Sequence, residues 1–268
     1  DFLPQVRRPL TVTREMFGVG LWFIMTGLFK KAVISDYIGV NFVNRIFDDP
    51  SLYTGLENLI GIYGYALKLY CDFSGYSDMA IGVALWLGFY IPANFRSPYK
   101  SVNITEFWRR WHISLSSWLR DYLYISLGGN RKGKFRTNLN LFLTMLLGGL
   151  WHGASLNFIV WGSIHGAALV VHKWWSRMFN GKSLKVNGER GTVNGERGTV
   201  KGILSRASTF LSILLTFHVV CLCWLFFANA TFDASWVMLT KIFTEFHGET
   251  LNQFLAGYPL VTSLIILG

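Results

Sequence analysis

Histidines in apolar surroundings are the first candidates for chemistry in this sequence. The chain has six histidines, and His152 lies between Trp151 and Gly153 at the end of an apolar run, without a carboxylate beside it. A neutral imidazole is suited to general-base catalysis because its ordinary pKa lies close to neutral pH. A histidine that forms a hydrogen bond between two packed helices has the same sequence surroundings. The residue type alone therefore leaves both interpretations open.

A metal centre is not indicated by the remaining histidines and cysteines. His165 and His172 are seven residues apart and so share one face of a helix. A ligand pair would more naturally be four residues apart, and no third ligand is near in the sequence, which favours packing and headgroup contacts for both. The three cysteines also lack the paired spacing of a zinc site. We therefore expect no bound metal and no bound cofactor.

The segment 70–78, Tyr-Cys-Asp-Phe-Ser-Gly-Tyr-Ser-Asp, contains two acids between apolar stretches. We predict that it ends one helix and begins the next, because Gly75 permits a turn and Asp78 is a common helix cap. Asp72 is harder to explain as a cap, since an acid at a helix C-terminus opposes the helix dipole. It is therefore a candidate for lining a polar cavity.

Residues 97–136 mix aromatic side chains with charges throughout. This composition is typical of an amphipathic helix at a membrane surface, with tryptophan at headgroup level and arginine reaching phosphates. Thr105 followed by Glu106 suits a helix N-terminus. The segment is either packed on the membrane surface or forms the rim of a substrate entrance.

The composition indicates that the elements around these residues lie in a bilayer. Hydrophobic residues make up 51% of the 268-residue chain and charged residues only 15%, whereas soluble domains carry about 25% charged residues. Only residues 203–228 are long enough for an unbroken crossing, and the shorter, interrupted segments favour an all-α, polytopic helical bundle around a polar cavity. The candidate spans are residues 16–34, 52–70, 77–92, 138–151, 156–172, 203–228 and an apolar run from 251.

The formal charge of +10 is explained by topology. Basic residues gather in loops 120–136 and 173–206, which flank the apolar segments 138–151 and 156–172. The positive-inside rule then predicts a helical hairpin with both loops in the cytoplasm and His152 within the membrane thickness. No nucleic-acid-binding motif is present, so we expect no nucleic acid partner.

A single membrane-embedded domain is predicted over residues 1–268. Within it, residues 180–202 contain two identical heptapeptides, Asn187–Val193 and Asn194–Val200, and are predicted to form a flexible, polar cytoplasmic loop. The chain begins without Met and stops inside an apolar run, so we expect it to be an internal piece of a longer protein.

Four stretches together resemble the membrane-bound O-acyltransferase (MBOAT) family. The resemblance is to its bacterial branch, which acetylates extracellular polysaccharides such as alginate or loads D-alanine onto teichoic acids. It implies a multi-pass protein of the bacterial cytoplasmic (inner) membrane, with short, broken and interfacial helices around a central funnel. The matching stretches are Asp72–Gly82, Phe107–Trp118, Arg120–Gly129 and Gly149–Ala154.

The resemblance also implies an activity and its residues. His152 would be the essential catalytic histidine and His112 the second functional one. The family transfers an acyl group from a cytosolic thioester, acetyl-CoA or an acyl-carrier protein, to an acceptor across the lipid bilayer. We therefore predict an O-acyltransferase in which His152 deprotonates a polysaccharide hydroxyl. A separate extracytoplasmic acyltransferase is the expected partner protein.

Six further residues are assigned to substrate binding. Acids would shape the pocket or its entrance, and arginines would meet donor phosphates, although headgroup anchoring explains the arginines nearly as well. An amide would orient the acyl carbonyl or His152. These candidates are Asp72, Asp121, Asn157, Arg109, Arg110 and Arg120.

Two other functions compete with acetyl transfer. One is D-alanyl transfer to teichoic acid. The other is a non-enzymatic membrane transporter or scaffold, because interrupted helices and a buried histidine also suit a transporter.

Overall fold

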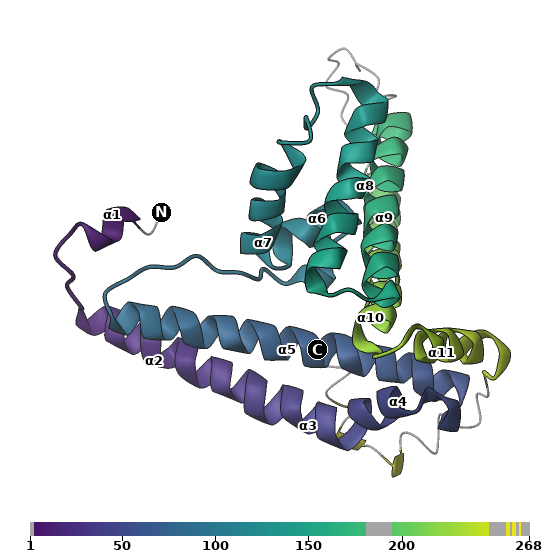
Figure 1. The fold of residues 1–268 in the computed structure, drawn as a ribbon, viewed down its shortest axis with the longest axis horizontal. Coiled ribbons are helices and arrows are strands. Elements are labelled where there is room, and N and C mark those ends of the chain that lie inside the picture. Colours follow the sequence, from purple (N-terminus) through teal and green to yellow (C-terminus); the bar gives the residue numbers. More distant parts are fainter. Residues whose placement is uncertain (1–2, 181–194, 247–255, 258, 261–262, 264–268) are drawn as a thin grey trace. The chain divides into compact units, whose positions relative to one another are not determined.

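The computed structural model describes residues 3–180, 195–246, 256–257, 259–260 and 263. Within these residues the protein consists of helices and connecting loops, without a β-strand (Figure 1), which confirms the predicted all-α class. They form two compact units, Asp1–Phe95 with Trp224–Gly268, and Arg96–Cys223. Each unit is described by itself below.

The first unit is built on two long antiparallel helices, α2 (Arg14–Leu28) and α5 (Gly55–Trp86), which lie side by side in Figure 1. Thr13 caps α2 by accepting a hydrogen bond from the Met16 backbone N–H. Thr54 and Glu57 cap α5 with a reciprocal pair of bonds. The remaining elements of this unit are α1 (Leu3–Val6), η1 (Phe29–Ser35), α3 (Asp36–Ile38), η2 (Gly39–Val43), α4 (Asn44–Asp48), η3 (Pro50–Leu52) and α11 (Phe232–Thr244).

Glycines bring α2 and α5 into close contact. Gly20 of α2 faces Gly82 of α5, and Gly27 of α2 faces Gly75 of α5. Within each helix the two glycines are seven residues apart. A Cβ on Gly27 would lie 2.5 Å from the Gly75 carbonyl oxygen, and one on Gly75 would lie 2.7 Å from the Gly27 carbonyl oxygen. Helix backbones can approach this closely only where no side chain separates them.

The predicted helix break at residues 70–78 is wrong, because α5 runs through this segment without interruption. Gly75 allows α2 to pack closely against α5. The two acids pair with lysines of η1. Asp72 Oδ1 lies 2.6 Å from Lys31 Nζ, and Asp78 Oδ2 lies 2.6 Å from a lysine of η1, Lys30. Side-chain pairing between helices therefore explains these acids, and helix capping does not.

The second unit contains a helical hairpin, α8 (Gly133–His152) and α9 (Leu156–Asn180), as the pairing of segments 138–151 and 156–172 predicts. Gly162 and Gly166 of α9 permit its contact with α8, since a Cβ on Gly162 would lie 2.6 Å from the Met145 carbonyl oxygen. The other elements are η4 (Pro98–Lys100), α6 (Ile104–Arg110), α7 (Ile113–Trp118), η5 (Leu119–Tyr124) and α10 (Gly195–Ala228), which is shared with the first unit.

The amphipathic segment differs from its prediction at its start and in its middle. Asn103 caps α6 by accepting a hydrogen bond from the Glu106 backbone N–H, 2.8 Å away, so the helix begins before Thr105. It then breaks at Trp111–His112 before α7 begins. Of the predicted loop 180–202, residues 181–194 lie outside the described residues, and α10 already begins at Gly195 in the second heptapeptide.

Two helical stretches of the described residues are long and apolar enough to cross a membrane, Arg14–Asp48 and Arg206–Ala228. The second agrees with the predicted span 203–228. The same length and composition also occur in the core helices of soluble proteins, so the multi-pass bundle around a funnel stays a prediction.

The α2–α5 contact generates a stability prediction. Gly82→Ala places a Cβ against the Gly20 carbonyl oxygen and 2.7 Å from Ile24 Cγ1, so the helices must separate, at a cost of about 1–3 kcal/mol. We expect a lower midpoint of thermal unfolding for the purified protein in detergent. Gly18→Ala is the matched control, because no heavy atom lies within 4 Å of its Cβ position. Equal midpoints for the two variants would contradict the close approach.

Candidate functional site

Two histidines on one face of α9 hold α6 in place. The Trp108 indole N–H donates a hydrogen bond to His165 Nδ1 at 3.3 Å, and Thr105 Oγ1 lies 2.9 Å from His172 Nδ1. His165 is fully buried and also packs against Phe107. The two histidines thus pack by bonding α6: one turn of α6 is fixed at two points along α9.

His112 lies in the turn between α6 and α7, in a backbone conformation that few non-glycine residues adopt. Its φ is 44° and its ψ is 58°, in the left-handed region. The turn is closed by the Ser116 N–H, which donates to the His112 carbonyl oxygen at 2.9 Å, and His112 Nδ1 lies 3.3 Å from Ser114 Oγ. Strained conformations of this kind persist where surrounding structure fixes them and are concentrated at functional sites.

His152 is the last residue of α8 and lies among aromatic rings. Its imidazole packs edge-to-face against Trp161 of α9, with ring centroids 5.3 Å apart, and contacts Trp151 and Phe158. Trp161 in turn packs against His165, at 4.8 Å between centroids. An aromatic cluster therefore connects His152 to the point where α6 is attached to α9.

His112 and the neighbour of His152 line the same cavity. Trp151, whose ring packs against that of His152, lines it together with His112. Burial, and to a smaller extent His152, lower the pKa of His112 to about 4. His112 is thus neutral at pH 7, and its two ring nitrogens supply one hydrogen-bond donor and one acceptor.

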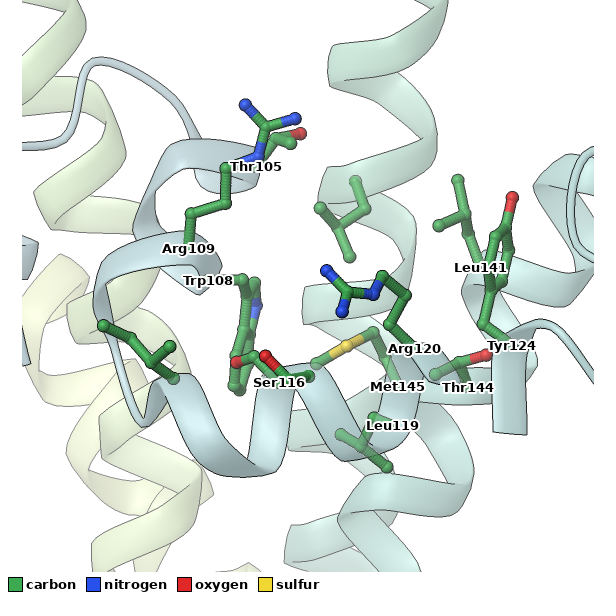
Figure 2. A pocket seen from close by; sticks show the side chains of 13 residues that line it. Thr105, Trp108, Arg109, Ser116, Leu119, Arg120, Tyr124, Leu141, Thr144 and Met145 are labelled. Carbon is green, nitrogen blue, oxygen red and sulfur yellow. The ribbon is translucent and has the colours of Figure 1, made fainter. Parts of the chain in front are cut away.

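One cavity of the second unit carries two arginines and is called the arginine pocket here. It has a volume of about 440 Å³ and lies between α6, α7, η5, α8 and α9. Figure 2 shows Arg109 extending from α6, and Arg120 extending from η5 with its guanidinium directed into the pocket. Among the described residues, Arg109 has no carboxylate within ion-pair distance, so its charge is available to a ligand. The pocket suits an anionic group next to an apolar one.

A second cavity contains His112 and is called the histidine pocket here. Its volume is about 570 Å³, and apart from His112 and Ser114 its lining is apolar. The apolar residues are Leu115, Trp118, Leu119, Leu123, Leu147 and Trp151. Because the lining combines a neutral imidazole with leucine and tryptophan, it suits a small acyl group or the apolar part of a substrate.

The other predicted binding residues lie outside these pockets. Asp121 forms a two-pronged ion pair with its neighbour Arg120, at 2.7 and 3.0 Å, and this bonding lowers the pKa of the Asp121 carboxyl. Arg110 is paired with Glu106 on the same helix. Asn157 is buried at the start of α9, where its backbone N–H donates to Ser155 Oγ.

Asp72 belongs to the first unit. It pairs there with Lys31, and both line a separate cavity of about 390 Å³. Within the described residues, no three His, Cys, Asp or Glu side chains are placed to hold a metal ion.

The sequence analysis missed the residues that support the histidines, namely Trp108, Trp161 and Thr105. A signal for all three existed in the spacing, because Trp161 lies one turn before His165, and Thr105 and Trp108 lie on one side of their helix. The interaction of these positions across two helices depends on tertiary structure, so spacing alone does not pair them.

Comparison with known proteins places these features in a family. Residues 1–195 match the model of the MBOAT, membrane-bound O-acyltransferase family. A probable alginate O-acetylase of Pseudomonas putida is 54% identical over 163 residues, which are 61% of this chain and 33% of that protein. A peptidoglycan O-acetyltransferase of Helicobacter pylori is 39% identical over 221 residues, 81% of this chain and 37% of that protein.

A more distant relative has a different named activity. A teichoic acid D-alanyltransferase of Bacillus subtilis is 30% identical over 230 residues, 81% of this chain and 52% of that protein. The chain therefore spans between about a third and a half of the length of these curated relatives.

The attachment of α6 generates a prediction. Thr105→Val removes the hydroxyl that bonds His172 while keeping the side-chain shape, so we expect a loss of about 1 kcal/mol in the free energy of unfolding. Thr105→Ser keeps the hydroxyl and should retain most of that stability. Denaturant unfolding in detergent measures both variants, and an equally stable Thr105→Val variant would show that the bond does not hold α6.

Proposed function

We propose, because this chain belongs to the membrane-bound O-acyltransferase family, that it forms the catalytic part of a membrane enzyme that O-acetylates a cell-envelope polysaccharide. The acetyl group would come from a cytosolic thioester, acetyl-CoA or an acyl-carrier protein. The relatives that share 39–54% identity are named as O-acetylating enzymes of alginate or peptidoglycan, which supports acetyl as the group and a polysaccharide hydroxyl as the acceptor.

The observation that carries the proposal is the apolar pocket that His112 lines together with Trp151, the residue that packs against the His152 ring. His152 acts as general base and removes the proton of the acceptor hydroxyl. The oxygen then attacks the thioester carbonyl, an ester C–O bond forms, and the C–S bond breaks. The proton passes from His152 to the departing thiolate, so the imidazole is neutral again after each transfer.

His112 serves the same reaction from the turn between α6 and α7. Because it is neutral at pH 7, it can donate one hydrogen bond to an oxygen of the substrate without adding a charge. Its left-handed backbone fixes the direction of the ring, and a fixed donor stabilises developing charge better than a mobile one.

The arginine pocket is the proposed donor site. Both proposed donors carry phosphate groups, and Arg109 and Arg120 offer planar guanidinium groups that bind phosphate through two parallel hydrogen bonds. Asp121 holds the Arg120 guanidinium from the side. Headgroup phosphates of the bilayer are the competing ligands of these two arginines.

Location and partners follow from the same proposal. The chain would lie in the bacterial cytoplasmic membrane as a multi-pass bundle, with the basic loops 120–136 and 173–206 in the cytoplasm near the thioester donor. The acceptor polysaccharide would be reached from the other side, with a separate extracytoplasmic acyltransferase as partner protein.

D-alanyl transfer to teichoic acid is the second candidate. It is supported by the named activity of the Bacillus subtilis relative, at the lower identity of 30%. A non-enzymatic transporter or scaffold has less support, because the matching family is one of acyltransferases. Mass analysis of the surface polymer from cells with and without the protein distinguishes an acetyl from a D-alanyl group.

Replacing the proposed base tests the mechanism. His152→Gln keeps a polar side chain of similar size and removes the base, so we expect acetyl transfer in membranes to fall by about 10²–10⁴-fold. The matched control is His218→Gln, a change at an exposed histidine of α10, which should leave the rate unchanged. A folded His152→Gln variant with the original rate would exclude His152 as the base.

Neighbouring arginines test the donor site. Arg109→Gln removes a charge from the arginine pocket, so we expect a KM for acetyl-CoA about tenfold higher, the ratio for a loss of about 1.4 kcal/mol, with little change in kcat. Arg110→Gln is the control, because Arg110 pairs with Glu106 and does not line the pocket. Equal KM values for the two variants would assign Arg109 to headgroup contact instead.

A further inference from the structure

The helix formed by α7 and η5 has one cavity on each of two faces. Ile113, Ser116 and Ser117 of α7, with Arg120 and Tyr124 of η5, line the arginine pocket. This spacing of three, one, three and four residues follows one side of a helix. The other side, with Ser114, Leu115, Trp118 and Leu123, lines the histidine pocket.

The two pockets also share the wall of α8. Leu141, Thr144 and Met145 border the arginine pocket, and Leu147 and Trp151, one to two turns later, border the histidine pocket. Along α8, the residues of the arginine pocket therefore come before those of the histidine pocket. The boundary between the two sets falls at Leu146, between Met145 and Leu147.

Among the described residues, Leu119 is the one that lines both pockets, and its side chain is buried. It points at Gly148 of α8, where a Cβ would lie 3.4 Å from Leu119 Cδ1 and 3.8 Å from Leu119 Cδ2. An added Cβ at Gly148 would make an ordinary van der Waals contact with Leu119, so the Leu119 side chain lies next to this part of α8. Gly148 follows Leu147, two residues past the boundary that the lining of α8 defines.

We propose that Leu119, packed on Gly148, is the wall between the arginine pocket and the histidine pocket and sets the length of acyl group that the enzyme transfers. This rests on the proposed function. The phosphate-bearing part of the thioester is held in the arginine pocket, its carbonyl carbon lies at the Leu119 side chain, and the acceptor hydroxyl approaches from the histidine pocket. An acetyl group fits against Leu119, whereas each further methylene must occupy the volume of the leucine.

The reaction at this wall is the proposed one, with no added reactant. The hydroxyl oxygen forms a C–O bond to the acyl carbon, the C–S bond breaks, and the hydroxyl proton passes through His152 to the thiolate. Leu119 takes no part in bond making. It acts as a specificity-determining residue, by excluding the larger acyl groups from the position of attack.

The test is the acyl preference of the full-length protein in membranes, with acetyl-, propionyl- and butyryl-CoA as donors and one polysaccharide as acceptor. One methylene is discriminated by about 10- to 200-fold in a fitted pocket. We expect Leu119→Ala to raise the ratio of kcat/KM for butyryl over acetyl transfer by about tenfold or more. This ratio is independent of the amount of folded enzyme, so a merely structural role of Leu119 would not move it.

Two control variants distinguish the removal of the Leu119 wall from the enlargement of one pocket alone. Leu141→Ala enlarges only the arginine pocket and Leu147→Ala only the histidine pocket, so both should keep the original preference. If either changes the preference as much as Leu119→Ala does, the wall is excluded. Leu119→Val removes less volume and serves where the alanine variant does not fold. It should admit propionyl more than butyryl, and an unchanged order would also exclude the wall.

The result distinguishes the two proposals. An active wild type whose preference is unaffected by Leu119→Ala overturns the wall and leaves the acyltransferase proposal standing. A wild type that transfers no acyl group from any of the three donors overturns the proposed function and the wall with it.

Discussion

The attachment of α6 to α9 is the constraint on which the site depends. His165 and His172 lie two turns apart on one face of α9, and each bonds a side chain of α6, Trp108 and Thr105. A buried ring nitrogen without a partner would destabilise the fold, so the bond from Trp108 both satisfies Nδ1 of His165 and fixes α6. With α6 fixed, the turn that follows can hold His112 at a positive φ.

The same cluster positions the other histidine of the site. Trp161 packs on one side against His165 and on the other against His152, so the end of α8 is held by the aromatic group that holds α6. The two proposed catalytic groups are thus supported by one rigid part of the second unit. A catalytic pair needs such support, because small displacements of the reacting groups reduce rates strongly. The two pockets lie against this part, and Leu119 lines both of them.

Much of the helical content was predictable, but several of its boundaries were not. Apolar segments 138–151 and 156–172 give the α8–α9 hairpin, because long apolar runs separated by a glycine-containing turn leave few alternatives. Residues 70–78 were assigned to a turn, and the structure has one unbroken helix there. The error has a physical cause, since Gly75 and Asp72 look like helix-ending residues until Gly27 and Lys31 of the opposite helix are placed against them.

The sequence by itself determined the chemical inventory: an all-helical, apolar chain with basic loops, and the motifs that hold His112 and His152. These depend on residue type and near-neighbour spacing, which are local properties. Only the tertiary structure decided which polar groups meet between helices. It paired Asp72 with Lys31, and it left Arg109 beside a cavity. The composition of one helix cannot specify the partner that faces it from another, and this choice separates a binding residue from a structural one.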